Sequence, residues 1–159
     1  MNASTDYKTL KAELNQLREE FEALRIELNK YKYDHLTGLQ GRRDFEVNFS
    51  KYFHEGDPFY LALVDINNLH EINRQQGYRE GDLVIRTVAT FLIEYFPGLK
   101  FRLGGDEFAI LSTVPFNTNL KIPNATWASV SSTNYKNCEE MFNAVDEQII
   151  KQKEKKVDA

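Results

Sequence analysis

Apolar side chains recur at alternating steps of three and four residues along the first part of the chain. The series consists of Tyr7, Leu10, Leu14, Leu17, Phe21, Leu24, Leu28 and Tyr31. Such spacing, kept over about four heptads, predicts a coiled coil, because it places one narrow apolar seam on a long helix. We therefore expect residues 1–33 to form a dimerisation helix, with the seam from Leu10 to Tyr31 buried against another chain.

The charged residues that flank this seam indicate how two such helices would pair. Every g position is acidic and every e position is basic. In a parallel pair, Glu13 would face Arg18 of the second chain and Glu20 would face Arg25, whereas an antiparallel pair would set like charges opposite each other. The pattern therefore favours a parallel homodimer. Leucine and aromatic residues at the a positions do not restrict the coiled coil to two helices, so a higher oligomer remains an alternative to the dimer. The alternative to a coiled coil is a helix folded back on its own domain.

Beyond Tyr33 the hydrophobic pattern changes to alternating helices and strands. Helices are predicted over residues 41–53, 68–76, 81–95 and 138–155, and strands over 59–66, 100–103, 108–112 and 126–132. The apolar run at 59–66 is typical of a buried central strand, and Gly104 and Gly105 predict a tight hairpin. The last helix should turn inward Met141, Val145, Ile149 and Ile150. These elements predict an α/β domain over residues 34–159.

Composition and charge exclude several classes of protein. The chain has 159 residues, with 20 Lys and Arg against 24 Asp and Glu, so it lacks the basic excess of a nucleic-acid-binding surface. Cys138 is the one cysteine and cannot form an intrachain disulfide, which fits a reducing compartment. No segment approaches the roughly 20 apolar residues of a membrane span. We expect a cytoplasmic protein that binds neither nucleic acid nor membrane.

Three acidic residues mark the place where chemistry is expected. Asp65 ends the apolar strand, and Asp106 and Glu107 occupy the hairpin tip. Carboxylates that converge at strand ends repel each other without a cation, so this arrangement predicts one or two Mg²⁺ ions and a substrate that carries phosphate. Gly104 and Gly105 would let the backbone approach that substrate closely. A polar hairpin tip without chemistry is the alternative, since acidic turns are common at protein surfaces.

Three stretches of the sequence together resemble one family. Residues 101–108, FRLGGDEF, resemble the signature of GGDEF-domain diguanylate cyclases, which join two GTP molecules into cyclic di-GMP. Residues 34–39 with Arg42, Arg43 and Phe45 are similar to the family's entry motif, and residues 65–82 are similar to its guanine-binding segment. The resemblance covers nearly all of residues 34–113. It implies a palm-like, ferredoxin-like nucleotidyl cyclase fold, here in a trimmed form, behind a coiled-coil helix.

The resemblance also implies roles for individual residues. The implied catalytic residues are Asp106 and Glu107, and the implied ligands of Mg²⁺ or Mn²⁺ are Asp65, the carbonyl of Ile66, Asp106 and Glu107. The implied GTP-binding residues are Asn73 and Asp82 for guanine, Gly104 and Gly105 in the turn, and Lys153 and His70 for the phosphates. Since one nucleotide attacks the other, two domains with one GTP each must face each other, and the parallel stalk would bring them together.

The sequence also departs from the family pattern. After Ser112 the family has a further helix and hairpin, whereas here a linker over 113–125 leads to the next strand, so one face of the sheet should be partly uncovered. Residues 95–98, YFPG, stand where the family's inhibitory Arg-x-x-Asp motif would be, so no product-inhibition site of that kind is expected. The alternative function is an inactive GGDEF module that binds GTP or another nucleotide and signals through protein contacts. A coiled-coil scaffold is a third interpretation.

Overall fold

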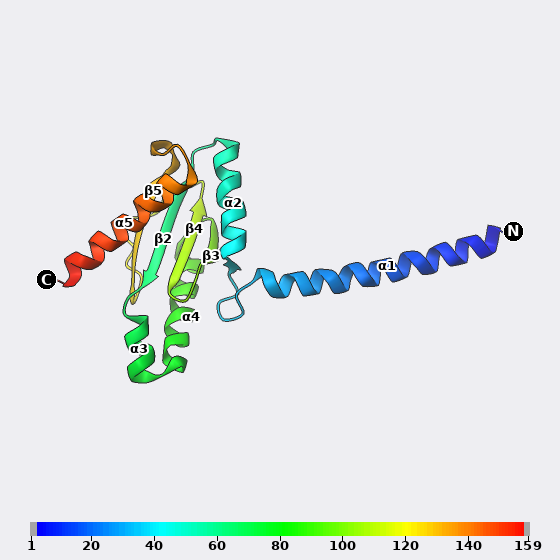
Figure 1. Cartoon of the computed structure of the whole chain (residues 1–159), viewed down its shortest axis with the longest axis horizontal. Coiled ribbons are helices and arrows are strands. Elements are labelled where there is room, and N and C mark those ends of the chain that lie inside the picture. The colour runs from blue at the N-terminus through cyan, green and yellow to red at the C-terminus, as the bar shows by residue number, and fades with distance from the viewer. Residues whose placement is uncertain (1–2, 158–159) are drawn as a thin grey trace. The chain divides into compact units, whose positions relative to one another are not determined.

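The computed structural model describes residues 3–157, and contacts between residues divide the chain into two units at Tyr33 and Asp34 (Figure 1). The first unit is one helix, α1 (Ala3–Lys32). The seam side chains from Tyr7 to Leu28 are between 48% and 68% exposed in the single chain. The side chain of Tyr31 lies outside the described residues. A long helix with an exposed apolar stripe has no partner for that stripe within its own unit.

The second unit contains the helices and strands of an α/β domain. Its helices are α2 (Arg42–Glu55), α3 (Leu69–Gln76), α4 (Tyr78–Tyr95) and α5 (Cys138–Val157). Its strands are β1 (Gln40–Gly41), β2 (Tyr60–Ile66), β3 (Leu99–Arg102), β4 (Glu107–Ser112) and β5 (Ala125–Ser131). Each helix and strand predicted for this unit is present. In the described part of the unit, the two-residue β1 and a short 3-10 helix over Ser132–Asn134 were not predicted. No helix in the described part of the chain has the length and hydropathy that a membrane crossing requires.

The predicted start of the helix over residues 81–95 was wrong. This helix, α4, begins at Tyr78 and not at Gly81. Gly81 lies inside the helix and is buried. A Cβ atom at this position would lie 1.9 Å from Oδ1 of Asn73 on α3, so the glycine allows α3 and α4 to approach closely. Gly77, with φ of 88°, makes the break between the two helices.

The five strands form one sheet in the order β1-β3-β4-β2-β5. β2 is the buried central strand that the sequence predicted, with β4 and β5 antiparallel on its two sides. β3 and β4 form the predicted hairpin, and the short β1 pairs parallel with β3. β5 is therefore an edge strand of seven residues, whereas the other edge is only two residues long.

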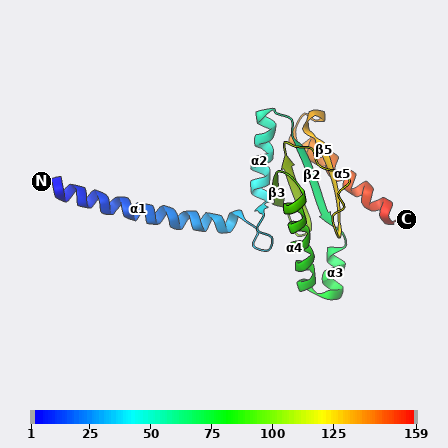
Figure 2. The same cartoon turned by 180° about the vertical axis from the view of Figure 1, so that it is seen from behind.

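Helices cover both faces of the sheet (Figures 1 and 2). Alternate side chains of β2 face α2 and α5 on one side and α3 and α4 on the other, which gives two apolar cores. The linker after β4 adds Phe116 and Ile122 to the core between the sheet and the helices α3 and α4. The linker therefore covers part of this face of the sheet, and a groove remains beside β5. On α5, Ile149 is buried but Ile150 is 49% exposed, so the expectation for Ile150 was wrong because adjacent helical residues point about 100° apart.

Candidate active site

Strand pairing brings the predicted acidic residues to one end of the sheet. Asp65, near the end of β2, lies directly opposite Glu107, the first residue of β4. The backbone N–H of Ile66 donates a hydrogen bond of 2.9 Å to the carbonyl of Asp106 in the hairpin tip. The register between β2 and β4 therefore fixes the backbone positions of all three acidic residues.

The Asp65 side chain lies under the closing helix. It is 24% exposed, and its Oδ1 accepts a hydrogen bond from Nζ of Lys153 on α5. Burial raises the pKa of Asp65, the nearby charges of Asp106 and Asp146 raise it further, and the Lys153 ammonium opposes that rise. A nearby cation stabilises a half-buried carboxylate that has other acids around it, and here that cation is the Lys153 ammonium.

Two arginines hold the hairpin tip. Arg42, the first residue of α2, donates from Nε to the carbonyl of Leu103 at 2.9 Å and from Nη2 to Oε2 of Glu107 at 3.3 Å. The Glu107 carboxylate is half exposed, so this ion pair orients the side chain and contributes little to stability.

The second arginine, Arg102, ties the tip to the start of the domain. Its Nη1 donates to both carboxylate oxygens of Asp34 at 3.0 Å. Its Nε and Nη2 donate to the carbonyls of Gly104 and Gly105 at 3.2 and 2.9 Å. One largely buried guanidinium therefore joins Asp34 to the two glycines, and it satisfies carbonyls that the tight turn leaves unpaired. No role for Arg102 was inferred from the sequence, where its only signal was its place directly before Leu103 and the glycines.

We expect Asp34→Asn to destabilise the domain in a pH-dependent way. Burial opposes the charged form of Asp34, but hydrogen bonds from Thr37 and Arg102 outweigh it and lower the pKa. The stabilisation is therefore complete above the unfolded-state pKa of about 3.9 and is lost as pH falls through the lower folded-state value. Chemical denaturation at pH 7 should show a loss of about 1–3 kcal/mol in the free energy of unfolding.

The matched control is Asp57→Asn, which changes an exposed carboxylate in the turn after α2. This variant should unfold like the unmodified chain at pH 7. The difference between Asp34→Asn and the unmodified chain should shrink when both are measured below about pH 4. An equal loss at every pH would contradict a charged Asp34 as the source of the stabilisation.

The residues that the resemblance assigns to guanine lie on α3 and α4. Asn73 is half-buried on α3, with its side-chain amide against Gly81, and Asp82 follows Gly81 with an exposed side chain. His70 is exposed on α3, and no contact in the described residues joins it to the acidic residues at the sheet end. The structure thus brings Asn73 next to the residue before Asp82, while His70 stays apart.

The acidic side chains offer oxygen ligands for a metal ion, but they are not arranged around one common point. Among residues 3–157, no group of three or more His, Cys, Asp or Glu side chains is arranged to hold a metal ion. Asp65 is engaged by Lys153, and Glu107 is engaged by Arg42. Asp65 and Asp106 remain close enough for their charges to interact. Two carboxylates and a backbone carbonyl form the kind of hard oxygen set that suits Mg²⁺.

Comparison with known proteins adds sequence relatives to this geometry. The family model described as "Diguanylate cyclase, GGDEF domain" matches residues 31–124. Diguanylate cyclase DgcZ of Escherichia coli (strain K12) is 38% identical over 82 residues, which cover 49% of this chain and 28% of that protein. Diguanylate cyclase VdcA of Vibrio cholerae is 27% identical over 121 residues, which cover 68% of this chain and 36% of that protein. The chain thus spans about a third of the length of these relatives.

Solved structures share the fold. The coiled coil and GGDEF domain of DgcB from Caulobacter crescentus, in complex with c-di-GMP, superposes with a TM-score of 0.72 at 22% identity, covering 97% of this chain and 95% of that one. The S helix-GGDEF-EAL part of LapD from Vibrio cholerae, bound to c-di-GMP, gives a TM-score of 0.68 at 21% identity, covering 93% of this chain and 38% of that one. The predicted fold class is confirmed. With its signature at residues 101–108 and a family match over more than half of its length, the chain belongs to the GGDEF domain family.

Proposed function

We propose that this protein is a diguanylate cyclase, which condenses two GTP molecules into cyclic di-GMP across a homodimer in the cytoplasm. The observation that supports this most is the register between β2 and β4, which sets Asp65 opposite Glu107 with Asp106 beside them and Lys153 above. In this proposal residues 1–33 are the dimerisation coiled coil and residues 34–159 are the catalytic domain. No inhibition through an Arg-x-x-Asp site is expected, because residues 95–98 lack that motif.

The metal-binding residues in this proposal are Asp65, Asp106 and the carbonyl of Ile66, with Glu107 at a second ion. The donor set fits, because it offers only oxygen ligands and because Asp65 is half-buried near other acids, where a cation is favoured. Bound Mg²⁺ or Mn²⁺ would supply neutralisation of the triphosphate and stabilisation of the attacking and leaving oxygens.

The side chains of this chain would hold the nucleotide and move the proton. Glu107 accepts the proton of the ribose 3′-OH, whose oxygen bonds to the α-phosphorus of the facing GTP as the bond to the leaving pyrophosphate breaks. Arg42 keeps the Glu107 carboxylate oriented toward the hairpin tip. Lys153 has a flexible stem, so its ammonium can leave Asp65 and bind a terminal phosphate oxygen. His70 would contact phosphate only weakly when its imidazole is neutral.

Guanine recognition is assigned to Asn73 and Asp82 in this proposal. The Asp82 carboxylate accepts hydrogen bonds from the N–H groups of guanine, and the Asn73 amide donates to its carbonyl. Adenine lacks a matching pair of donors on that edge, so an acid here selects GTP over ATP.

The glycines of the turn would make room for the nucleotide. A Cβ at Gly105 would meet no atom within 4 Å, and neither Gly104 nor Gly105 has positive φ. Neither packing nor backbone conformation therefore requires a glycine at position 105. The close approach of a nucleotide, the role proposed here, is a reason for it.

An inactive GGDEF module that binds a nucleotide and signals through protein contacts is the second candidate function. The ion pairs Lys153–Asp65 and Arg42–Glu107 favour it, because both carboxylates already have a cationic partner. The short linker between β4 and β5 favours it as well, since it replaces a longer segment of the family pattern.

One incubation separates the two candidates. The purified chain is mixed with GTP and Mg²⁺, and nucleotides are separated by chromatography to detect cyclic di-GMP. Formation of the product supports the cyclase. Saturable GTP binding without product, over a range of protein concentrations that includes the dimer, supports the inactive module instead.

The parallel orientation of the stalk is tested by its charges. Glu13→Lys with Glu20→Lys should weaken self-association by about tenfold to a hundredfold at low salt, because the new lysines would face Arg18 and Arg25 of the second chain. Adding Arg18→Glu and Arg25→Glu should restore it. In the single chain Arg25 pairs with Glu22 at 2.7 Å, a bond it can exchange for the facing helix. Analytical ultracentrifugation measures the mass, and an unchanged mass after Glu13→Lys with Glu20→Lys would contradict the parallel pairing, because an antiparallel pair already sets like charges opposite each other.

A further inference from the structure

The two edges of the sheet are protected to different degrees. β1 is two residues long, so it offers little backbone to another strand. β5 has seven residues, ATWASVS, and carries neither a charged residue nor a proline. Natural proteins usually protect an edge of this length with charge, proline or a bulge, because it presents unpaired backbone groups. An edge without these features is available for pairing.

The register shows which backbone groups of β5 face outward. Ser132 donates from its N–H to the carbonyl of Phe59 at 2.8 Å, and Asn67 donates to the carbonyl of Asn124 at 2.7 Å. Bonded and non-bonded pairs alternate in an antiparallel ladder, so the backbone groups of Ala128 face β2 and those of Trp127 and Ser129 face away from it. Within residues 3–157, no backbone hydrogen bond from another element reaches the N–H or carbonyl of Trp127 or Ser129.

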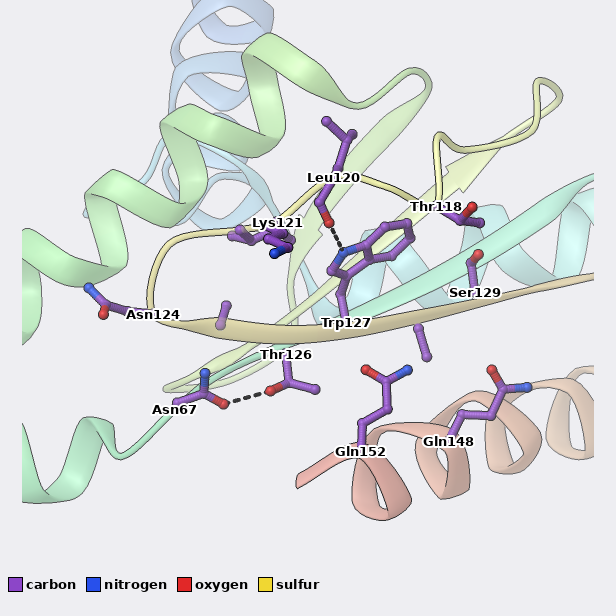
Figure 3. A pocket seen from close by; sticks show the side chains of 13 residues that line it. Asn67, Thr118, Leu120, Lys121, Asn124, Thr126, Trp127, Ser129, Gln148 and Gln152 are labelled. Carbon is purple, nitrogen blue, oxygen red and sulfur yellow. Dashed lines mark hydrogen bonds between the residues drawn. The ribbon is translucent and has the colours of Figure 1, made fainter. Parts of the chain in front are cut away.

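A groove of about 720 Å³ runs along this edge (Figure 3). On one side of the strand stand the Trp127 indole, which donates to the carbonyl of Leu120 at 2.9 Å, and the neighbouring Lys121. On the other side, Gln148 and Gln152 project from α5 toward the strand. The unpaired backbone edge thus lies between an aromatic and cationic wall and a wall of side-chain amides.

The lining indicates the chemistry of the occupant. Lys121 is the one charged residue among the described residues that line the groove, and the others are amides, hydroxyls, aliphatic groups and the indole. Amides and free backbone groups match the donors and acceptors of a peptide backbone. A single lysine is too little for a polyphosphate, but it can pair with one carboxylate.

We propose that β5 accepts an extended peptide segment of a partner protein as a sixth strand, with an acidic residue of that segment beside Lys121. Side chains of an added strand alternate between the two faces of the sheet. Those on one face would contact Trp127 and Lys121, so they should be apolar or acidic. Those on the other would contact Gln148 and Gln152, so they should be polar and uncharged.

The test begins with selection of random displayed decapeptides on the full chain. Selected peptides without tryptophan are then titrated while tryptophan emission is recorded. The chain contains one tryptophan, so all of this emission comes from Trp127. We expect enriched peptides to alternate as described, to carry an acid and to shift the emission. The same peptides methylated at alternate backbone nitrogens should bind about tenfold more weakly or worse, because they lose donors to the edge.

Two variants examine the protein side of the groove. Ser129→Pro removes an outward N–H, and proline is tolerated at such an edge position, so the chain should fold but bind the selected peptides at least about tenfold more weakly. Lys121→Glu should reverse the preference toward peptides in which lysine replaces the acid. If Ser129→Pro does not fold, the methylated peptides on the unmodified chain give the same information.

Three results would overturn the proposal. One is a selection in which no peptide shifts the Trp127 emission. Another is equal affinity for methylated and unmethylated peptides, which would indicate a site without strand pairing. The third is a lower mass of Ser129→Pro in sizing, which would mean that β5 pairs with a second copy of this chain. These measurements do not depend on turnover, so they are independent of the cyclase activity.

Discussion

Replacing Glu107 with glutamine is expected to lower the rate of cyclic di-GMP synthesis by about 10²- to 10⁴-fold, the usual contribution of a positioned general base. Glutamine keeps the size of the side chain but cannot accept the proton of the ribose hydroxyl. GTP binding should be largely kept, since the guanine-binding residues Asn73 and Asp82 and the first ion's ligands Asp65 and Asp106 are unchanged. Turnover is measured by chromatography of the products, and binding by titration with GTP at equilibrium.

The control for this change is Glu94→Gln, which neutralises an exposed glutamate on α4. It should leave turnover within about twofold, as surface substitutions usually do. Arg42→Ala should reduce turnover less than Glu107→Gln, because Arg42 orients the carboxylate without taking the proton. If Glu107→Gln turned over GTP as fast as the unmodified chain, the proposed role of Glu107 would be wrong.

Leu24→Lys in the stalk is expected to convert the chain to a monomer and to remove cyclase activity at the same time. Leu24 is 61% exposed in the single chain, and the proposed coiled coil would bury it in both copies. Each lost leucine contributes roughly 1.5–3 kcal/mol of burial, and a charge in the seam adds a desolvation cost. Sizing by light scattering and turnover as a function of protein concentration measure the two effects.

Ile26→Lys is the matched control for the stalk. Ile26 lies on the same helix two residues further on, at an outer heptad position, and it is 55% exposed. Lysine there should leave both mass and turnover within about twofold, because outer positions do not contact the second helix. A monomeric Leu24→Lys chain with full activity would contradict the need for two facing domains.

The helices and strands followed from sequence because their signals are local. Periods of 3.5 and 2 residues, glycines at turns and a continuous apolar run predict α1, β2 and the β3–β4 hairpin without any distant contact. Gly81 shows where local reasoning failed. It resembled a helix start, but it lies inside α4, which begins at Tyr78. A glycine stands there because Asn73 on α3 occupies the space that a side chain would fill.

The features of the candidate site also divide into those that the sequence predicted and those that only the structure revealed. The sequence by itself determined that Asp65 lies near the end of a buried strand, that Asp106 and Glu107 follow the two glycines of a hairpin turn, and that the stalk carries an apolar seam with charges of fixed sign. These features depend on the order of residue types, which a single chain displays directly.

Only the tertiary structure decided which side chains surround those acids. Lys153 meets Asp65 across 88 residues of sequence, and Arg102 meets Asp34 across 68. It also left β5 as a free edge beside a groove, because the short linker covers the face of the sheet but not its side. Such contacts depend on how helices pack on the sheet, and the pattern of one segment carries no information about the distant segment that will lie against it.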